Sequence, residues 1–269
     1  MHIGILLEIR DYQRESPNIA NMIQLLSERG FSLDLIYPEK QPIQLRKVQI
    51  QNDLYLIKSG TPTSMSLAGA LHALGAVTIN PYPTVVMLQN KIIVTRVLQQ
   101  AGVPTPETFI AHRPQDLATF LEEGALIVKP YKGFRGQGIS IISNSAELEE
   151  LQVDGLIFAQ RFHPTDGNYY SIYRIGEKLF GVHRIWPSKG IEDRFGEPFV
   201  VSPELRDIAL NVGQAFGISL YGMDVIISDG QPYVVDVNKF GSFLGVPEAP
   251  HHLADYISAS ALRIGHAVY

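Results

Sequence analysis

The chain has 269 residues and contains no cysteine, which excludes disulfide bonds, thiolate metal sites and cysteine nucleophiles. It also lacks a strong excess of charge of one sign, and its net charge of −5 argues against binding to nucleic acid or to an anionic membrane. No segment approaches the roughly 18 apolar residues of a membrane span, and the N-terminal stretch MHIGILLEIR lacks the basic start and the length of a signal peptide. These absences predict a cytoplasmic protein whose partners are neither nucleic acids nor membranes.

The first part of the chain alternates between expected strands and helices. Strands are expected at 2–7, 31–36, 53–57 and 76–79, and helices at 17–29 and 63–74. This alternation predicts a small parallel sheet. No G-x-G-x-x-G motif follows the first strand, so a dinucleotide site is not expected. Lys58 comes directly after a strand, where ligands of such sheets bind, although a solvated loop lysine is an open alternative.

The prolines of Asn80-Pro81-Tyr82-Pro83 predict a linker, and the rest of the chain is expected to be richer in β-structure. A continuous helix is expected at 84–100, and 187–201 is expected to be a loop. The other expected elements are strands at 104–110, 125–129, 156–160, 168–176 and 178–186, and helices at 114–122, 145–151, 203–216 and 249–265.

The stretch YGMDVIISDGQPYVVDVNKFGSFLG at 221–245 reads as a β-hairpin that carries acids on one face. Alternation with period two predicts that a buried face is formed by Val225, Ile227, Tyr233, Val235 and Val237. The same alternation places three oxygen-bearing side chains on the opposite face, namely Asp224, Asp236 and Asn238.

The register of this hairpin decides whether the two acids meet. A two-residue Asp229-Gly230 turn would place Asp224 opposite Val235, whereas a three-residue loop centred on Gly230 places Asp224 opposite Asp236. We predict the three-residue loop. Two opposed carboxylates repel unless a cation lies between them, and an oxygen-only ligand set favours Mg²⁺ over Zn²⁺. The alternative is an exposed sheet face with two unrelated acids.

A glycine-rich segment, PYKGFRGQGISII at 130–142, separates two short β-rich runs. Glycines allow backbone N–H groups to converge on phosphate oxygens, and Lys129 at the end of the preceding strand could reach the same phosphates. The segment is not a Walker A loop, because it has no G-K-[ST] and a strand follows it. A flexible surface turn is the alternative.

Five segments in this order resemble the ATP-grasp superfamily, most closely its RimK-like branch of carboxylate–amine ligases: NKIIVTRVLQQAGVPTPETF, LIVKPYKGFRGQGISII, IFAQRF, YGMDVI and VVDVNKFGSFLGV. The resemblance implies an α/β protein with an ATP-grasp fold. A small parallel-sheet domain at 1–83 would precede two β-rich subdomains, at 84–162 and 163–269, that clasp ATP. It implies an ADP-forming C–N ligase that makes an amide through an acyl phosphate. A kinase that phosphorylates a hydroxyl, or a nucleotide-binding module with little catalysis, is the alternative.

The resemblance also implies residue roles. ATP phosphates would be held by Lys91, Lys129 and the loop residues Lys132, Gly133, Arg135, Gly136, Gln137 and Gly138. The hinge that hydrogen-bonds adenine would be Gln160, Arg161 and Phe162. Mg²⁺, with Mn²⁺ as a possible substitute, would be bound by Asp224, Asp236 and Asn238. Arg184 would stabilise the phosphate in the transition state.

The sequence departs from the family pattern at three places. Arg161 stands where an acid is usual, and Tyr169-Tyr170-Ser171 replaces an Asp-x-Arg, so ribose recognition is expected to pass to Asp166 or Asn168. Asn238-Lys239-Phe240-Gly241 lacks the usual proline. The substrates would be a carboxylate-bearing small molecule or peptide and an amine, with Lys58, Lys239 and Gly241 as candidate contacts. The oligomeric state is left open, although the resemblance makes a homo-oligomer, a dimer or a tetramer, the usual form.

Overall fold

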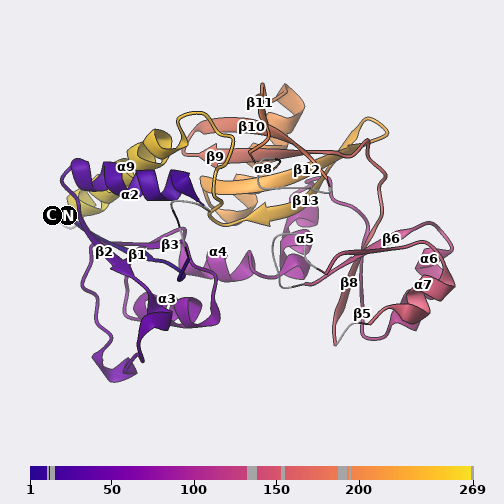
Figure 1. Ribbon diagram of the computed structural model, residues 1–269, viewed down its shortest axis with the longest axis horizontal. Helices are drawn as coiled ribbons and strands as arrows, with labels where there is room; N and C mark the ends of the chain where they lie inside the picture. The colour runs from indigo at the N-terminus through magenta and orange to yellow at the C-terminus, as the bar shows by residue number, and fades with distance from the viewer. Residues whose placement is uncertain are drawn as a thin grey trace.

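Three β-sheets, each with its own helices, make up the protein (Figure 1). The computed structural model describes residues 1–10, 12, 16–131, 138–152, 155–186, 193 and 195–267. Within these residues, no helix has the length and apolar character needed to cross a bilayer.

The N-terminal sheet is parallel throughout, with strand order β2-β1-β3-β4, as predicted. Its strands are β1 (His2–Leu6), β2 (Ser32–Ile36), β3 (Leu54–Ile57) and β4 (Thr78–Ile79), and its helices are α2 (Pro17–Glu28), α3 (Pro62–Ala73) and the short η1 (Pro38–Lys40) and η2 (Leu45–Lys47). The Thr61 side chain accepts a hydrogen bond from the Ser64 N–H and so caps α3. Lys58, which directly follows β3, donates to the carbonyls of Phe240 and Gly241, so the carboxyl end of β3 faces the C-terminal part of the chain.

The single helix predicted at 84–100 is wrong, because the chain forms two helices there. These are α4 (Tyr82–Met87) and α5 (Lys91–Gln100), so Tyr82 and Pro83 are also helical rather than linker. The Asn90 side chain accepts hydrogen bonds from the N–H groups of Ile92 and Ile93, which starts a new helix. Lys91 therefore lies at the first position of α5.

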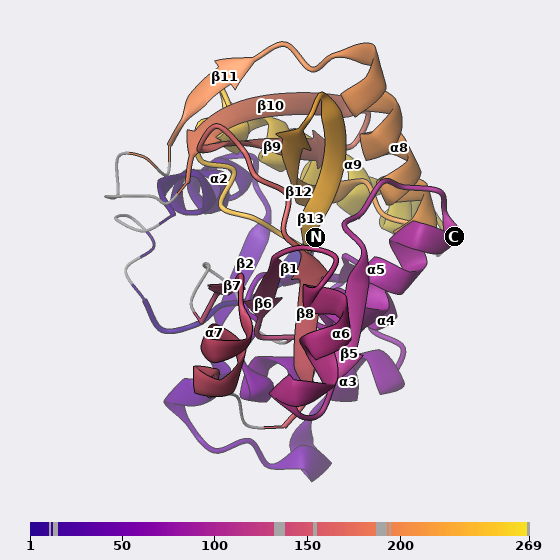
Figure 2. The same cartoon turned by 90° about the vertical axis from the view of Figure 1, so that its right-hand side faces the viewer.

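The middle sheet is antiparallel, with strand order β5-β8-β6-β7. Its elements are β5 (Thr108–Ala111), η3 (Pro114–Leu117), α6 (Ala118–Leu121), β6 (Leu126–Lys129), β7 (Ser140–Ile142), α7 (Ser145–Glu150) and β8 (Ile157–Arg161). It has a small core of its own, which includes Leu117, Leu126 and Ile157. Figure 2 shows this unit facing the viewer, below the larger C-terminal sheet.

The C-terminal sheet is also antiparallel, with strand order β11-β10-β9-β12-β13. Its elements are β9 (Asn168–Ile175), β10 (Lys178–Ile185), β11 (Glu197–Phe199), α8 (Pro203–Phe216), β12 (Leu220–Ser228), β13 (Gln231–Asn238) and α9 (Ala249–Ala267). The predicted loop at 187–201 thus contains a short edge strand, β11, which is too short to show a period. One face of the sheet packs on α8 and α5 through residues such as Leu98, Val212 and Met223.

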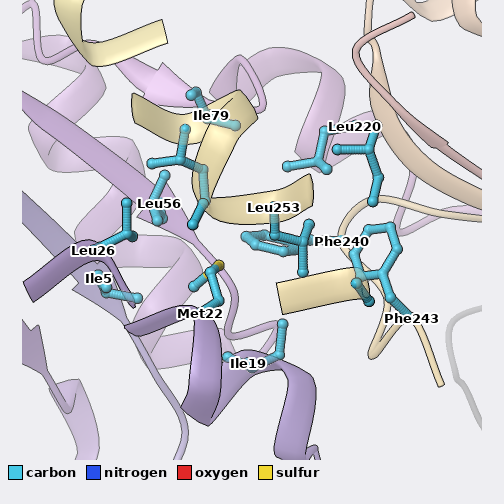
Figure 3. Packing of buried hydrophobic residues seen from close by; sticks show 14 of the residues in the cluster. Ile5, Ile19, Met22, Leu26, Leu56, Ile79, Leu220, Phe240, Phe243 and Leu253 are labelled. Atoms are coloured by element: carbon cyan, nitrogen blue, oxygen red, sulfur yellow. The ribbon is translucent and has the colours of Figure 1, made fainter. Parts of the chain in front are cut away.

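The largest core joins the two ends of the chain (Figure 3). Met22 and Leu26 of α2 and Leu56 of β3 pack in one cluster with Phe243 and with Leu253 of α9. Arg29 Nη2 donates to Asp255 Oδ1 at 2.7 Å and ties α2 to α9 on the surface. The predicted division at 83 and 162 remains a prediction; in the structure α5 packs on the C-terminal sheet, and the first domain shares its interior with that sheet.

Candidate functional site

The β12–β13 hairpin turns through two residues, so the predicted three-residue loop is wrong. Ser228 pairs with Gln231, and Asp229 and Gly230 both have positive φ, 49° and 76°, as the mirror-image hairpin turn requires. Asp224 nevertheless lies opposite Asp236, as predicted. A β-bulge accounts for this: Val225 pairs with Val234, and Val235 is the extra residue that shifts the register by one.

The buried side chains of the hairpin also differ from those predicted. Val225, Val234 and Val237 are buried against α5 and α8, whereas Ile227, predicted to be buried, is 36% exposed. Tyr233 and Val235 are only partly buried, so their predicted place in the core is wrong as well. The Tyr233 ring stacks on the His163 ring with a centroid distance of 4.0 Å.

The face that carries the acids collects polar groups from three strands. Ser171 on β9 pairs with Asp224 and its Oγ donates to Asp224 Oδ1 at 2.5 Å. Burial raises the pKa of Asp224, the neighbouring Asp236 raises it further, and the Ser171 hydrogen bond opposes both. Asn238 follows Asp236 by two residues and so shares its face.

These residues fit a hard divalent cation. In the described part of the chain, no group of three or more His, Cys, Asp or Glu residues could hold a metal. Two carboxylates and an amide oxygen on one face remain, and oxygen-only donors suit Mg²⁺. After burial, the charge of Asp236 is the next cause of the raised pKa of Asp224, and a cation between the two carboxylates would relieve this repulsion.

One lysine from another element contacts an acid, and a second lies within electrostatic reach of both acids. Lys91 Nζ, on the first residue of α5, lies 2.5 Å from Asp236 Oδ1. Lys129, at the end of β6, has its pKa lowered to about 8 by burial, an effect that the Asp236 charge opposes. The structure therefore brings together both lysines that the resemblance assigned to phosphate binding.

The predicted adenine hinge is held firmly by the middle sheet. The Gln160 side chain accepts from Lys129 Nζ at 2.9 Å and donates to Thr108 Oγ1 at 3.1 Å. The backbone N–H groups of Arg161 and Phe162 donate to the carbonyl oxygens of Glu107 and Ala125. These two donors are therefore not available to a base, so only backbone acceptors could contact adenine at Arg161 and Phe162.

The side chain of Arg161 is bound within the middle unit. Its Nη1 donates to the carbonyl oxygens of Phe120 and Gly124, both at 2.8 Å, and its Nη2 pairs with Glu107 and Glu123. The arginine that replaces the usual acid thus joins β8 to the α6–β6 connection.

Asp166 is not brought to the acid-bearing face. Its Oδ1 accepts from the Asn168 N–H and closes a turn, and Asn168 Oδ1 in turn contacts His183 Nε2 at 2.8 Å. Asp166 lines a crevice of about 450 Å³ together with Tyr170 and Ile227. By strand alternation, Tyr170 and Ile227 lie on the sheet face opposite to Ser171 and Asp224.

Most of the predicted phosphate loop lies outside the described residues, namely Lys132, Gly133, Arg135, Gly136 and Gln137. Gly138 is described and has a φ of +70°, a conformation that glycine adopts without strain.

Arg184 on β10 is a buried cation, 5% exposed, beside the acids. It points to the same face as Ser171, its Nη2 donates to the Leu244 carbonyl at 2.7 Å, and its guanidinium lies 5.6 Å from the centre of the Tyr173 ring. Its charge lowers the pKa of Asp224, which places it within electrostatic reach of the predicted metal ligands.

The three predicted substrate contacts meet at the junction of the N-terminal sheet and the segment after Asn238. Lys58 Nζ donates to the Phe240 and Gly241 carbonyls at 2.7 and 3.1 Å, and Lys239 Nζ donates to the Ser59 carbonyl at 3.0 Å. Burial lowers the pKa of Lys239 to about 8. A Cβ on Gly241 would lie 3.3 Å from the Tyr173 ring, so the close approach there favours glycine.

Several residues of this region were not predicted from the sequence as site residues: Asn18, Asn80, Ser171 and Tyr173. Ser171 could have been found from the strand alternation that places it beside the acids once β9 pairs with β12. No local pattern marks the two asparagines.

Comparison with known proteins agrees with this geometry. Residues 88–244 match the RimK-like ATP-grasp domain. The chain belongs to this family. Over 248 residues it is 24% identical to the alpha-aminoadipate–LysW ligase LysX of Saccharolobus solfataricus, covering 85% of this chain and 88% of that protein.

Solved ATP-grasp structures show the same fold. The RimK domain protein of Sphaerobacter thermophilus superposes with a TM-score of 0.76 at 19% identity, covering 95% of this chain and 99% of that one. The ATP-grasp ligase PsnB, complexed with a minimal precursor, Mg and ADP, gives a TM-score of 0.73 at 17% identity, covering 96% and 97%. The expected ATP-grasp fold is confirmed. The relatives are named as ligases. This ATP-grasp protein is therefore an ATP-dependent carboxylate–amine ligase.

Proposed function

We propose that this ligase joins the carboxylate of an amino acid or peptide to an amine through an acyl phosphate. A carboxylate oxygen attacks the γ-phosphorus of ATP and ADP leaves. The amine nitrogen then attacks the acyl carbon, loses a proton, and phosphate leaves with the electrons of the C–O bond. The observation that carries this proposal is the meeting of Lys91, Lys129 and Arg184 with the paired acids Asp224 and Asp236.

The residues divide this work by charge. The ammonium groups of Lys91 and Lys129 would hold the phosphates, because they converge on the acids from α5 and β6. Mg²⁺, with Mn²⁺ as a substitute, would be held by Asp224, Asp236 and Asn238 and would neutralise phosphate charge. Arg184 is already buried and oriented, so it would stabilise negative charge that develops in the transition state.

The named relatives support amino-acid or peptide substrates. Their names include alpha-aminoadipate, LysW and L-glutamate, and a similar solved structure, that of the ATP-grasp ligase PsnB, contains a precursor peptide. We place the acid and the amine beside the carboxyl ends of β1 and β3, near Lys58, Lys239 and Gly241. The cytoplasmic location and the homo-oligomer predicted from the sequence are part of the proposal.

One incubation tests the reaction. The protein is supplied with ATP, Mg²⁺ and a panel of amino acids and small diacids, and ADP, phosphate and products are measured. Free phosphate that appears only when both acid and amine are present supports the ligase. Phosphate retained on an alcohol would indicate a kinase, and ATP that binds without turnover would indicate a binding module; either result overturns the proposal.

The Asp236→Asn variant tests the metal assignment in the same assay. It keeps the shape of the side chain and removes one of the two opposed charges, so turnover should be lost while the fold is retained. Asp116→Asn is a matched control, because Asp116 is paired with Arg113 on the surface of the middle unit. Full activity in the Asp236 variant would remove this residue from the metal site.

A further inference from the structure

A chain of polar side chains crosses the middle sheet. Gln160 lies on β8, the strand between β5 and β6 (Figure 1), and the register pairs it with Thr108 on one side and with Ile127 on the other. Lys129 is two residues beyond Ile127 on β6, so the side chains of Thr108, Gln160 and Lys129 share one face of the sheet. The opposite face packs in the core of the middle unit, for example through Ala159.

Gln160 is a deeply buried polar residue, with an exposed fraction of 2%. A buried side-chain amide needs partners for its oxygen and for its nitrogen, because leaving either unpaired costs free energy. Gln160 Oε1 accepts from Lys129 Nζ at 2.9 Å, and Gln160 Nε2 donates to Thr108 Oγ1 at 3.1 Å. The amide is therefore engaged at both ends within the protein.

The direction of each hydrogen bond in this chain follows from Thr108. A threonine hydroxyl has one hydrogen, and Thr108 Oγ1 donates it to the Pro106 carbonyl oxygen at 2.8 Å. Toward Gln160 the hydroxyl oxygen can therefore act only as an acceptor, which requires the amide nitrogen on that side. The amide oxygen must then face Lys129, because a turned amide would set an N–H group against an ammonium. Thr108 thus fixes which end of Gln160 meets Lys129.

Lys129 needs such an acceptor because it is a buried cation. Burial lowers its pKa to about 8, the charges of Asp236 and Asp224 oppose this change, and the charge of Lys91 adds to it. A hydrogen bond from the ammonium to an amide oxygen favours the charged form and holds it in one direction. Asp236 is itself paired with Lys91 at 2.5 Å, whereas Gln160 accepts directly from Lys129.

A neutral acceptor suits this place better than a carboxylate. A carboxylate at position 160 would pair with Lys129 and repel the phosphates that Lys129 is proposed to bind. An amide oxygen directs the ammonium without bringing a competing charge. It also remains an acceptor when a cation cancels the charges of Asp224 and Asp236, which favour the charged form of Lys129.

We propose that Gln160 and Thr108 are positioning residues that hold the ammonium of Lys129 toward the nucleotide phosphates. The inference rests on the proposed function, in which Lys129 binds phosphate. Gln160 then contributes to nucleotide affinity through Lys129 and not through a contact of its side chain with the base. Thr108 extends the phosphate site to β5, a strand on which the sequence predicted no site residue.

The test measures the affinity for Mg-ATP as a function of pH in four variants. Gln160→Met removes the acceptor and Gln160→Glu replaces it with a charge, whereas Thr108→Val removes the orienting hydroxyl and Thr108→Ser keeps it. Gln115→Met is the matched control, because Gln115 is an exposed glutamine of η3 in the same unit. Circular dichroism confirms that each variant is folded.

The expected shifts differ in sign between the variants. Gln160→Met should weaken Mg-ATP binding by roughly tenfold at neutral pH and lower, by about one pH unit, the pH at which affinity falls. Thr108→Val should change both quantities in the same direction by a smaller amount, and Thr108→Ser and Gln115→Met should behave as the parent protein. Gln160→Glu should also weaken binding but raise that pH, because a carboxylate favours the charged form of the lysine.

Inorganic triphosphate with Mg²⁺ separates an effect on phosphate from an effect on the base, because it contains no adenine. Gln160→Met should weaken the binding of triphosphate and of Mg-ATP by similar factors. A double-mutant cycle shows whether Thr108 acts through Lys129: in the Lys129→Met background, Thr108→Val should cause no further loss of Mg-ATP affinity. Lys47→Met, which changes an exposed lysine of η2, is the control for Lys129→Met.

Two results would overturn the inference. An unchanged pH dependence in Gln160→Met and Thr108→Val would show that neither residue acts on Lys129, and a loss of affinity for Mg-ATP with none for triphosphate would make Gln160 an adenine contact. If Gln160→Met does not fold, the comparison of Thr108→Val with Thr108→Ser gives the same decision. A parent protein that binds Mg-ATP but ligates no acid to any amine would remove the proposed function alone, since every comparison here measures binding.

Discussion

The ammonium of Lys91 lies 2.5 Å from the carboxylate of Asp236, so a predicted phosphate ligand is paired with a predicted metal ligand. This pairing makes Lys91 and Mg²⁺ competitors for one carboxylate. Lys91→Met should therefore raise the affinity for Mg²⁺ without nucleotide, by up to about fivefold if the partly exposed pair is worth about 1 kcal/mol. The same change should weaken Mg-ATP binding, because a phosphate contact is lost. Titration calorimetry measures both; weaker Mg²⁺ binding in the variant would contradict the competition, and Lys47→Met is the control.

Lys129 should make nucleotide binding sensitive to mild alkali. Its pKa is lowered to about 8 by burial, and only the protonated ammonium attracts phosphate, so affinity for Mg-ATP should fall as the pH rises above about 8, by up to roughly tenfold per pH unit. Lys129→Arg should flatten the profile, because guanidinium stays charged. Lys239 also has a pKa near 8, so an equally steep fall in the arginine variant would assign the effect elsewhere.

The side chain of Arg161 should contribute to the stability of the fold and not to nucleotide binding. Arg161→Met removes donors to two backbone carbonyls and two carboxylates, and we expect the free energy of unfolding to fall by about 2 kcal/mol. Affinity for Mg-ATP, measured where the variant is folded, should change less than about twofold. Arg113→Met removes an exposed arginine of the same unit and should leave the unfolding curve nearly unchanged.

Arg184 should act mainly on the rate of reaction. Arg184→Met keeps part of the buried volume and removes the charge, so kcat should fall by about a hundredfold, or roughly 3 kcal/mol, with a smaller change in Kd for Mg-ATP. Steady-state kinetics and equilibrium titration separate the two effects. Arg206→Met, on the exposed side of α8, is the control, and a loss confined to Mg-ATP affinity would assign Arg184 to ground-state binding.

The fold class and the pairing of Asp224 with Asp236 could be predicted from the sequence. The turn and bulge that produce this pairing could not. Period-two alternation places Asp224 and Asp236 on one face, and either a longer loop or a tight turn with a bulge satisfies it. The two consecutive valines before Asp236 give no sign of which one is extra. The structure has the bulge at Val235, so Val234 takes the place of Val235 on the buried face beside Val237.

The helix break at Asn90 was hidden for a related reason. Apolar residues continue through Leu88 into α5, so periodicity does not mark the interruption, and only the capping role of Asn90 reveals it. The hydrogen bonds that Asn18, Lys58 and Asn80 donate to the backbone carbonyls of residues 239–243 could not be predicted from the sequence. They join residues between 159 and 225 positions apart, and asparagine and lysine carry no local signal for such contacts.

The core shared by α2, β3 and α9 limits how the substrate preference of this enzyme could be altered by recombination. Exchanging residues 1–83 for those of a relative would replace one side of this packed core. Phe243 and Leu253 would then pack against side chains of a different shape. A graft that also carries 239–267 would transfer matching surfaces together. The two ends of the gene, far apart in the reading frame, are thus constrained to vary as a pair.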